Sequence, residues 1–520
     1  MPRNYGFIGR KQKPNTGSAG GVIGLNNSYH DTLDGNYPER TTTEYWAGIT
    51  KTAGQNESLD GCVVDVNGNV YVYGYYQPSS SGDNVSATNV TPYMQKWNSS
   101  GVLVWHKFYW HYDTSAATTN INGNIYSAAP SPDGNYIYAI GRLNQYLSSN
   151  SQGFDVGILK IDTSDGSVEW WKIYYTSYNS SVNYSDNMLV YRHNIVCGSN
   201  TEIYFCFYSR ASSDGRDEMK IVKINDSGTV QINKVINPTG NYDYNGSLAA
   251  RGSYVYVSFY YQSGYGSSDW GVMKLNTSLV TQWAKRYGTS SADQPYTIAV
   301  DSNDNVYVGG YANDTYSAST NYDAVIIKFN SSGTYQWARG MYGYQPSSAR
   351  YNYSEYLWSL AIDSDDNVYA SVVYGFRRLA FLVFNSSGTN TNRMVLESSY
   401  STSSQGLLDG YRLNISGNYL IPYIRSQNNE DIILKLNKDL SLPAASVDTG
   451  YAVISFLSSG TDNDLNVFTY NATTATTSVT ASAEVATLNV TTLSSSNMVV
   501  NTPFDDPAAV GSIARRRILL

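Results

Sequence analysis

Acidic and amide side chains crowd the middle of the sequence, where residues 301–305 read Asp-Ser-Asn-Asp-Asn. Oxygen ligands at such close spacing suit a hard cation such as calcium, but the same side chains also turn a chain by hydrogen-bonding their own backbone. A calcium loop of the EF-hand kind needs a bidentate Glu further along, and none is placed there. We therefore favour a hairpin turn over a calcium site and expect no metal and no cofactor.

Other residues with catalytic potential form no recognised pattern. His106 and His111 lie five positions apart on one expected strand, so they face opposite sides of it and are a poor zinc pair. Glu169 and Glu355 are possible glycosidase acids, but nothing in the sequence pairs them. There is no G-x-S-x-G, H-E-x-x-H or P-loop motif. We expect no catalytic residues.

Composition favours many short strands joined by polar turns. Charged residues make up 15% of the chain, and 49 Tyr stand against 13 Phe. The net charge of −8 argues against a nucleic-acid partner, and no apolar run reaches the length of about 18 residues that inserts in a membrane. The first 30 residues lack the apolar core of a signal peptide. We interpret Cys62, Cys197 and Cys206 as buried thiols.

The acidic stretch at 301–305 is one copy of a repeat. Strong copies begin at Asp65, Ser131, Asp301 and Asp363, and weaker ones at 200, 252 and 416, which makes seven. A second signature, a strand that ends in an amide or acid, follows each copy. Its last residues are Asn98, Asp162, Asn225, Asn276, Asn330, Asn385 and Asn437. A third signature, such as "YQWARGMYG", follows the second signature in six of the seven copies. The seventh example of this third signature, "EYWAGITK", begins at Glu44 and so stands before the first copy of the repeat.

The D-x-N-G-N-V-Y pattern resembles the repeats of seven-bladed β-propellers found in many bacterial and phage proteins. The resemblance implies an all-β fold of seven four-stranded blades over residues 44–445. It also implies that an N-terminal strand, Tyr45–Lys51, closes the ring against Asp431–Asn437. It says nearly nothing about function, because propellers serve as enzymes, lectins and scaffolds.

Long Tyr/Ser/Gly/Asn segments are expected to share one face of the propeller, and short turns the other. They come after the second strand of a blade and between blades. Tyrosine supplies rigid contact area and stacks on sugars, so this long-loop face is a candidate ligand-binding surface; the alternative is that these tyrosines only cover the blades. The candidates are Tyr76, Tyr261, Tyr265, Tyr311, Tyr316, Tyr322, Tyr342, Tyr344, Tyr351 and Tyr353.

The ends of the chain differ from the repeats. Residues 1–43 suggest an extended arm. Residues 446–505 carry Thr/Ser/Val strands, which suit a small β-rich domain or a strand-exchange module. Residues 506–520 end in a basic and apolar tail that is either a docking peptide or a solvated end. The docking candidates are Arg515, Arg516, Arg517, Ile518, Leu519 and Leu520.

The two ends, "MPRNYGFIGRKQ" and "SIARRRILL", resemble those of marine tailed-phage virion proteins of the cyanophage type. The resemblance implies a virion structural protein, such as a tail fibre or surface appendage, expected to be a homo-oligomer attached to other virion proteins through its termini. The expected task is host-surface glycan or receptor binding without catalysis. The alternatives are a glycan depolymerase enzyme, or a tail nozzle or capsid decoration protein without a ligand.

Overall fold

The computed structural model describes most of the region that carries the repeats and short parts of the rest. The described residues are 46–50, 56–77, 90–111, 123–143, 155–176, 186–187, 192–210, 217–236, 245–261, 268–289, 291–313, 322–343, 354–374, 378–398, 408–426, 431–440, 445–448, 453–457, 465–469, 473–476, 488–492, 498–501 and 514–516. Every element within them is a β-strand. None of these residues forms a helix long and apolar enough to cross a membrane. The arm predicted at 1–43 lies outside them.

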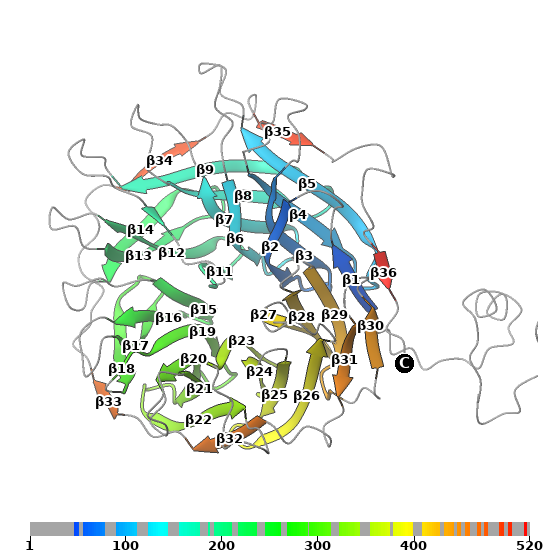
Figure 1. The fold of residues 1–520 in the computed structure, drawn as a ribbon. Helices are drawn as coiled ribbons and strands as arrows, with labels where there is room; N and C mark the ends of the chain where they lie inside the picture. The colour runs from blue at the N-terminus through cyan, green and yellow to red at the C-terminus, as the bar shows by residue number, and fades with distance from the viewer. Residues whose placement is uncertain are drawn as a thin grey trace, which may run out of the picture. The chain divides into compact units, whose positions relative to one another are not determined.

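Seven antiparallel sheets form the blades of a β-propeller, which confirms the predicted fold class (Figure 1). Blade 1 contains β2 (Asn56–Val64), β3 (Val70–Gln77), β4 (Thr91–Trp97) and β5 (Leu103–His111). Blade 2 contains β6 (Gly123–Pro130), β7 (Tyr136–Leu143), β8 (Asp155–Asp162) and β9 (Val168–Thr176). Blade 3 contains β11 (Ile195–Ser199), β12 (Glu202–Arg210), β13 (Asp217–Ile224) and β14 (Val230–Ile236), and β10 (Asp186–Asn187) also pairs with β12.

The remaining blades repeat the same order from the innermost strand outward. Blade 4 contains β15 (Asn245–Arg251), β16 (Tyr254–Tyr261), β17 (Asp269–Asn276) and β18 (Thr281–Gly288). Blade 5 contains β19 (Gln294–Val300), β20 (Val306–Asn313), β21 (Tyr322–Phe329) and β22 (Tyr335–Gly343). Blade 6 contains β23 (Tyr356–Ile362), β24 (Val368–Tyr374), β25 (Arg378–Phe384) and β26 (Asn390–Ser398). Blade 7 contains β27 (Leu408–Ser416), β28 (Tyr419–Ser426), β29 (Asp431–Asn437) and β1 (Trp46–Thr50).

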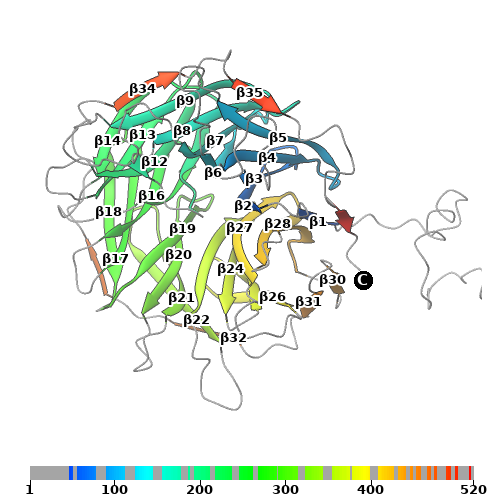
Figure 2. The ribbon, with the colours of Figure 1, turned by 45° about the horizontal axis from the view of Figure 1, so that its top comes forward.

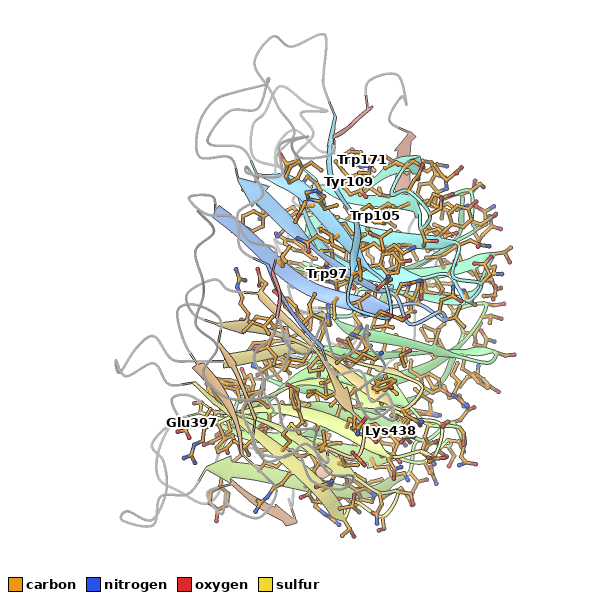
Figure 3. All side chains as sticks on the ribbon, turned by 90° about the vertical axis from the view of Figure 1, so that its right-hand side faces the viewer. Trp97, Trp105, Tyr109, Trp171, Glu397 and Lys438 are labelled. Atoms are coloured by element: carbon orange, nitrogen blue, oxygen red, sulfur yellow. The ribbon has the colours of Figure 1, made fainter. Side chains whose placement is uncertain are left out.

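The hydrophobic core is divided into seven clusters, one at each junction between neighbouring blades. Figure 3 shows Trp105 of blade 1 beside Trp171 of blade 2, and both belong to one of these clusters. At the junction of blades 7 and 1, Tyr423 and Ile433 pack with Leu59 and Val72. Because that junction has its own apolar core, the ring of blades closes upon itself. Successive side chains along each strand point to opposite faces of the blade, so each blade contributes apolar side chains to the clusters on both of its sides.

Side chains also join each blade to the next one around the ring. A Lys, Trp or Asn of one blade donates a hydrogen bond to a backbone carbonyl in the turn that follows the third strand of the next blade. The pairs are Lys96 to Thr163, Trp170 to Asp226, Lys223 to Thr277, Trp283 to Ser331, Trp337 to Ser386, Asn392 to Asp439 and Lys435 to Ser99. The last pair connects blade 7 to blade 1, so the direction is the same at every junction.

The short turns explain the repeat that the sequence displays. Asp301 accepts hydrogen bonds at Oδ1 from the backbone N–H groups of Asn303 and Asn305, at 3.0 and 2.8 Å. Its Oδ2 accepts from Asn305 Nδ2 at 2.7 Å and from the Tyr307 hydroxyl at 3.1 Å. Both carboxylate oxygens are thus engaged by the turn itself, which confirms the turn interpretation. Within the described residues there is no group of three or more His, Cys, Asp or Glu that suits a metal ion.

Strands from the C-terminal part of the chain pair with the outer edges of the blades (Figures 1 and 2). β31 (Val453–Leu457) pairs with β26, β32 (Leu465–Thr469) with β22, and β33 (Thr473–Thr476) with β18. β34 (Leu488–Thr492) pairs with β9, β35 (Met498–Asn501) with β5, and β36 (Ala514–Arg516) with β1. We call β31 to β36 the rim strands. The chain therefore visits blades 6, 5, 4, 2, 1 and 7 in that order.

These pairings differ from the small β-rich domain predicted for 446–505. Apart from β30 (Ala445–Asp448), which pairs with β31, each strand described there joins a blade rather than a sheet of its own. The physical reason is that the fourth strand of a blade offers a row of backbone N–H and C=O groups, which a short Thr/Val strand satisfies better than it can form an independent core. The alternative that the sequence offered, a strand-exchange module, is closer to these pairings.

Candidate binding site at the innermost strands

A β-bulge interrupts six of the seven innermost strands at the same place. The extra residues are Asp60, Tyr126, Tyr296 and Trp358, and the pairs at 246–247 and 410–411. Asp60 and Tyr296 each stand five residues before the first Asp of the following turn. A bulge redirects the side chain at the extra residue and is frequent beside functional sites. The repeated bulge therefore redirects side chains at equivalent positions of six innermost strands.

Aromatic residues gather at these bulges across blades 5, 6 and 7. The ring centres of Tyr296 and Trp358 are 4.6 Å apart and the rings are nearly parallel, and Trp358 meets Tyr411 edge-on at 5.0 Å. Tyr311 connects to Tyr296 at 5.4 Å and to Tyr322 at 4.4 Å. Tyr356 lies 5.4 Å from Tyr311 and 5.9 Å from Trp358. We call these six residues the inner aromatic cluster.

The inner aromatic cluster lies at the long-loop face of the propeller, where the long Tyr/Ser/Gly/Asn segments connect to the blades. Tyr322 and Tyr356 are the first residues of β21 and β23, and both strands begin at that face. Tyr322, Tyr356 and Trp358 are half-buried, whereas Tyr296, Tyr311 and Tyr411 are buried. The backbone carbonyl of Tyr322 accepts a hydrogen bond from the Glu355 N–H at 2.9 Å, which joins blades 5 and 6 beneath the rings. This bond holds the start of β21 beside the start of β23, where Tyr322 and Tyr356 lie.

Two arginines lie beside the cluster. The guanidinium carbon of Arg192 is 3.7 Å from the centre of the Tyr296 ring, although Arg192 belongs to blade 3 and Tyr296 to blade 5. Arg412 of blade 7 donates from Nη2 to the Arg192 carbonyl and from Nε to the Tyr73 hydroxyl, at 3.2 Å. These contacts connect blades 1, 3, 5 and 7 across the middle of the ring.

Burial shifts the pKa values of two charged residues in this region, Arg192 and Asp60. Burial, reinforced by the charge of Arg412, lowers the pKa of Arg192 to about 10, and contact with Tyr296 partly offsets the change. Burial also raises the pKa of Asp60 to about 7, although a hydrogen bond from Asn124 Nδ2 at 2.6 Å and the charges of Arg425 and Arg412 oppose the rise. Arg192 therefore stays charged at neutral pH, whereas Asp60 is divided between its two forms.

The structure brings only some of the predicted tyrosines together. Tyr311 and Tyr322 belong to the inner aromatic cluster, Tyr261 lies 5.5 Å from the Arg286 guanidinium, and Tyr342 is half-buried in β22. Tyr76 lies in β3, and nothing of its side chain is described. The other five candidates fall outside the described residues: Tyr265, Tyr316, Tyr344, Tyr351 and Tyr353.

Five residues of this site were not predicted from the sequence: Arg192, Tyr296, Tyr356, Trp358 and Tyr411. A signal was present, since Tyr296, Trp358 and Tyr411 each stand five residues before the first residue of their turn, Asp301, Asp363 and Ser416 respectively. Comparing that one position across the repeats would have revealed an aromatic residue in blades 2, 5, 6 and 7. No comparable signal exists for Arg192, because blade 3 carries one of the weaker copies of the repeat.

The other predicted residues do not form a second site. Glu169 is exposed on β9 of blade 2, whereas Glu355 is fully buried beside blade 6 and its Oε1 accepts from the Gly343 N–H at 3.1 Å. His106 Nδ1 is 3.4 Å from the Tyr93 hydroxyl. Cys62, Cys197 and Cys206 are free thiols, of which Cys197 is only half-buried. Arg515 and Arg516 lie in β36, and Arg517 and 518–520 fall outside the described residues.

Comparison with known proteins supports the architecture. Residues 282–315 match the family model of the beta-propeller repeat (SBBP). The matched segment covers most of β18 and all of β19 and β20, so it contains Tyr296, Tyr311 and the turn at 301–305. No curated protein sequence matches the chain.

Similar solved structures share little more than the kind of fold. A subtype N10 neuraminidase-like protein of influenza A/little yellow-shouldered bat/Guatemala/060/2010 is 7% identical, with a TM-score of 0.35 over 60% of this chain and 92% of that one. Drosophila Semaphorin 1b is 9% identical, with a TM-score of 0.34 over 81% and 92%. TolB from Acinetobacter baumannii is 13% identical, with a TM-score of 0.29 over 71% and 64%. Similarity this low carries no argument about function.

Proposed function

We propose that the protein is a non-catalytic glycan-binding protein whose propeller presents the inner aromatic cluster to a saccharide. The observation that carries this proposal is the run of half-buried rings from Tyr322 to Tyr356 and Trp358, at the face where the Tyr/Ser/Asn segments leave the blades. Flat aromatic faces bind the apolar side of a sugar ring, and a rigid base limits the entropy lost on binding.

The absence of an acid–base arrangement in the cluster favours binding over catalysis. Glycoside hydrolysis uses two carboxyl groups about 5 to 9.5 Å apart. Among the described residues around the rings, the carboxyl group of Glu355 is fully buried and engaged with the Gly343 backbone. Asp60 is likewise buried and hydrogen-bonded to Asn124 on the other side of the ring. Neither is placed as one of a pair beside the cluster.

We further propose that the protein is part of a tailed-phage virion and acts in host attachment. This step rests on the resemblance of the chain ends to such virion proteins. A surface that binds host glycans suits a protein displayed on a particle. The partners are then other virion proteins, contacted through the termini, and a glycan or receptor of the host. The location of the protein in intact particles, determined with labelled antibodies, tests this assignment, and its absence from purified particles would refute it.

Closure of the ring by the N-terminal strand belongs to the same proposal. β1 pairs with β29 over Trp46–Thr50 and Asp431–Lys435, and with β36 on its other side. In this arrangement residues from both ends of the sequence share blade 7. We infer that β1 supplies the fourth strand that blade 7 lacks in its own part of the chain, and that the rim strands protect blade edges from pairing with other molecules.

Saccharide binding can be tested on immobilised bacterial envelope polysaccharides. Replacing Tyr322 with Ala removes one half-buried ring, and we expect roughly tenfold weaker retention, since 1.4 kcal/mol corresponds to a factor of ten. Tyr136→Ala is a matched control, because Tyr136 is a half-buried tyrosine on the short-turn face, 3.9 Å from Lys160 Nζ. Equal losses in both variants would refute the location of the site. Release of reducing ends by the unaltered protein would refute the non-catalytic assignment and favour a depolymerase.

A further inference from the structure

Arg192 is a buried cation without a matching anion. It is 6% exposed, and its Nε and Nη1 atoms have no hydrogen-bond partner among the described residues. The neighbours that shift its protonation are Tyr296, Tyr311 and Arg412, none of which is an acid. Burying Nε and Nη1 without acceptors is costly, because these two donors have lost water, and the contact of the guanidinium with Tyr296 offsets only part of that loss.

Arg192 and Arg412 differ in how the donors of their side chains are used. Arg412, by contrast, uses its donors to hold the Arg192 carbonyl and the Tyr73 hydroxyl. Arg192 instead rests on Tyr296, whose ring also stacks on Trp358 at 4.6 Å. Asp60 is hydrogen-bonded to Asn124 and interacts with the charges of Arg425 and Arg412. No carboxyl group is among the neighbours that act on Arg192.

We propose that Arg192 binds the carboxylate of an acidic sugar, such as a hexuronic acid unit, while the inner aromatic cluster holds the sugar ring. A planar guanidinium presents paired donors that match the two oxygens of a carboxylate. Contact with Tyr296 fixes the plane of the guanidinium in advance, so little side-chain entropy is lost when the carboxylate binds. This inference rests on the proposed glycan-binding function and specifies the class of saccharide.

The first experiment uses the unaltered protein and a matched pair of probes. Oligogalacturonate and its methyl-esterified form have the same sugar rings and differ in charge, and their affinities are measured by calorimetry together with a panel of neutral oligosaccharides. We expect the free acid to bind about 10- to 100-fold more tightly than the ester. Equal affinity for both, or binding of neutral sugars alone, refutes this inference and leaves the proposed function intact. Failure of every saccharide to bind refutes both.

The second experiment removes the charge. Arg192→Met is expected to reduce the preference for the free acid to about that for the ester, and Arg251→Gln, at an exposed arginine on the short-turn face, is expected to leave it unchanged. Because the buried charge has no acceptor, Arg192→Met is also expected not to lower the melting temperature. A lower melting temperature with an unchanged preference would show that Arg192 is a structural residue and would refute the proposal.

Discussion

The indole of Trp337 in blade 5 lies directly against Gly388 in the turn of blade 6. A Cβ atom at Gly388 would stand 2.7 Å from Trp337 Cδ2, and Trp337 Nε1 donates to the carbonyl of Ser386 in the same turn at 3.0 Å. Gly166, Gly228 and Gly333 have the same relation to tryptophans of the preceding blades. The tryptophan of one blade thus packs where the turn of the next has glycine, whereas the equivalent turns of blades 4 and 7 have Leu279 and Leu440 at this position.

Replacing Gly388 with Ala tests this fit. The φ angle of Gly388 is +77°, so Ala is strained there in addition to meeting the indole. We expect the free energy of unfolding to fall by about 2–4 kcal/mol, measured by chemical denaturation. Gly417→Ala is the matched control, since its φ is +56° and nothing lies within 4 Å of the added atom; it should cost only about 1–2 kcal/mol. Equal losses in the two variants would show that contact with Trp337 adds nothing.

The acidic turn at 301–305 is expected to stabilise the fold without a metal. Asp301→Ala removes the acceptor of four hydrogen bonds and leaves the buried Tyr307 hydroxyl without its carboxylate, so the free energy of unfolding should fall by about 2–4 kcal/mol. Asp301→Asn should cost less, because one oxygen can still accept from the backbone. Calcium should leave the melting temperature of the unaltered protein unchanged. A rise with calcium that Asp301→Ala abolishes would contradict the turn interpretation.

Stability should depend on pH through Asp60. Its pKa is raised to about 7 by burial in the folded protein, whereas an unfolded Asp titrates near 4. The folded protein therefore holds this proton more tightly, and its contribution to stability is complete below about pH 4 and is lost as the pH rises through about 7. Three pH units correspond to an upper limit of about 4 kcal/mol.

The measurement compares the unaltered protein with Asp60→Asn across this range. The difference between their urea midpoints isolates Asp60 from the other carboxyl groups. We expect the difference to change between pH 4.5 and pH 7.5 in favour of the variant at the higher pH. A difference that stays constant with pH would show that Asp60 titrates normally, in spite of its burial and its bond to Asn124.

The role proposed for β1 can be tested by two deletions. Removal of residues 1–51 takes away the five residues that pair with β29, and we expect unfolding to become easier by about 3–5 kcal/mol, because the backbone groups of β29 lose their partners. It should also promote association through the exposed edge. Removal of 1–44 leaves β1 in place and serves as the control. Identical denaturation midpoints for the two proteins would rule out closure by β1.

The sequence was informative wherever a feature recurred. The turns and the strands after them repeat seven times, three of them with Asp at the start, so their period and alternation predict the blades. Of the six members of the inner aromatic cluster only Tyr311 and Tyr322 were predicted, because its members meet across blades through residues far apart in the chain. Arg192 of blade 3 contacts Tyr296 of blade 5, and no local pattern in the sequence predicts a contact between blades that are not adjacent. The sequence predicted strands in the region of the rim strands, but the composition of a Thr/Val stretch does not indicate which blade it pairs with.

The hydrogen bonds that run from each blade to the turn of the next have one further consequence. Every junction is head-to-tail, because one blade supplies the donor and the next supplies the acceptor. The hydrogen bond from Lys435 of blade 7 to Ser99 of blade 1 completes the series of seven such bonds. A heterologous contact of this kind either closes into a ring or continues into an open filament. If the ring were opened at any junction, the two new ends would be complementary to each other and to those of other copies. In the closed ring of seven blades, by contrast, each donor side meets the acceptor side of its neighbour within the same chain.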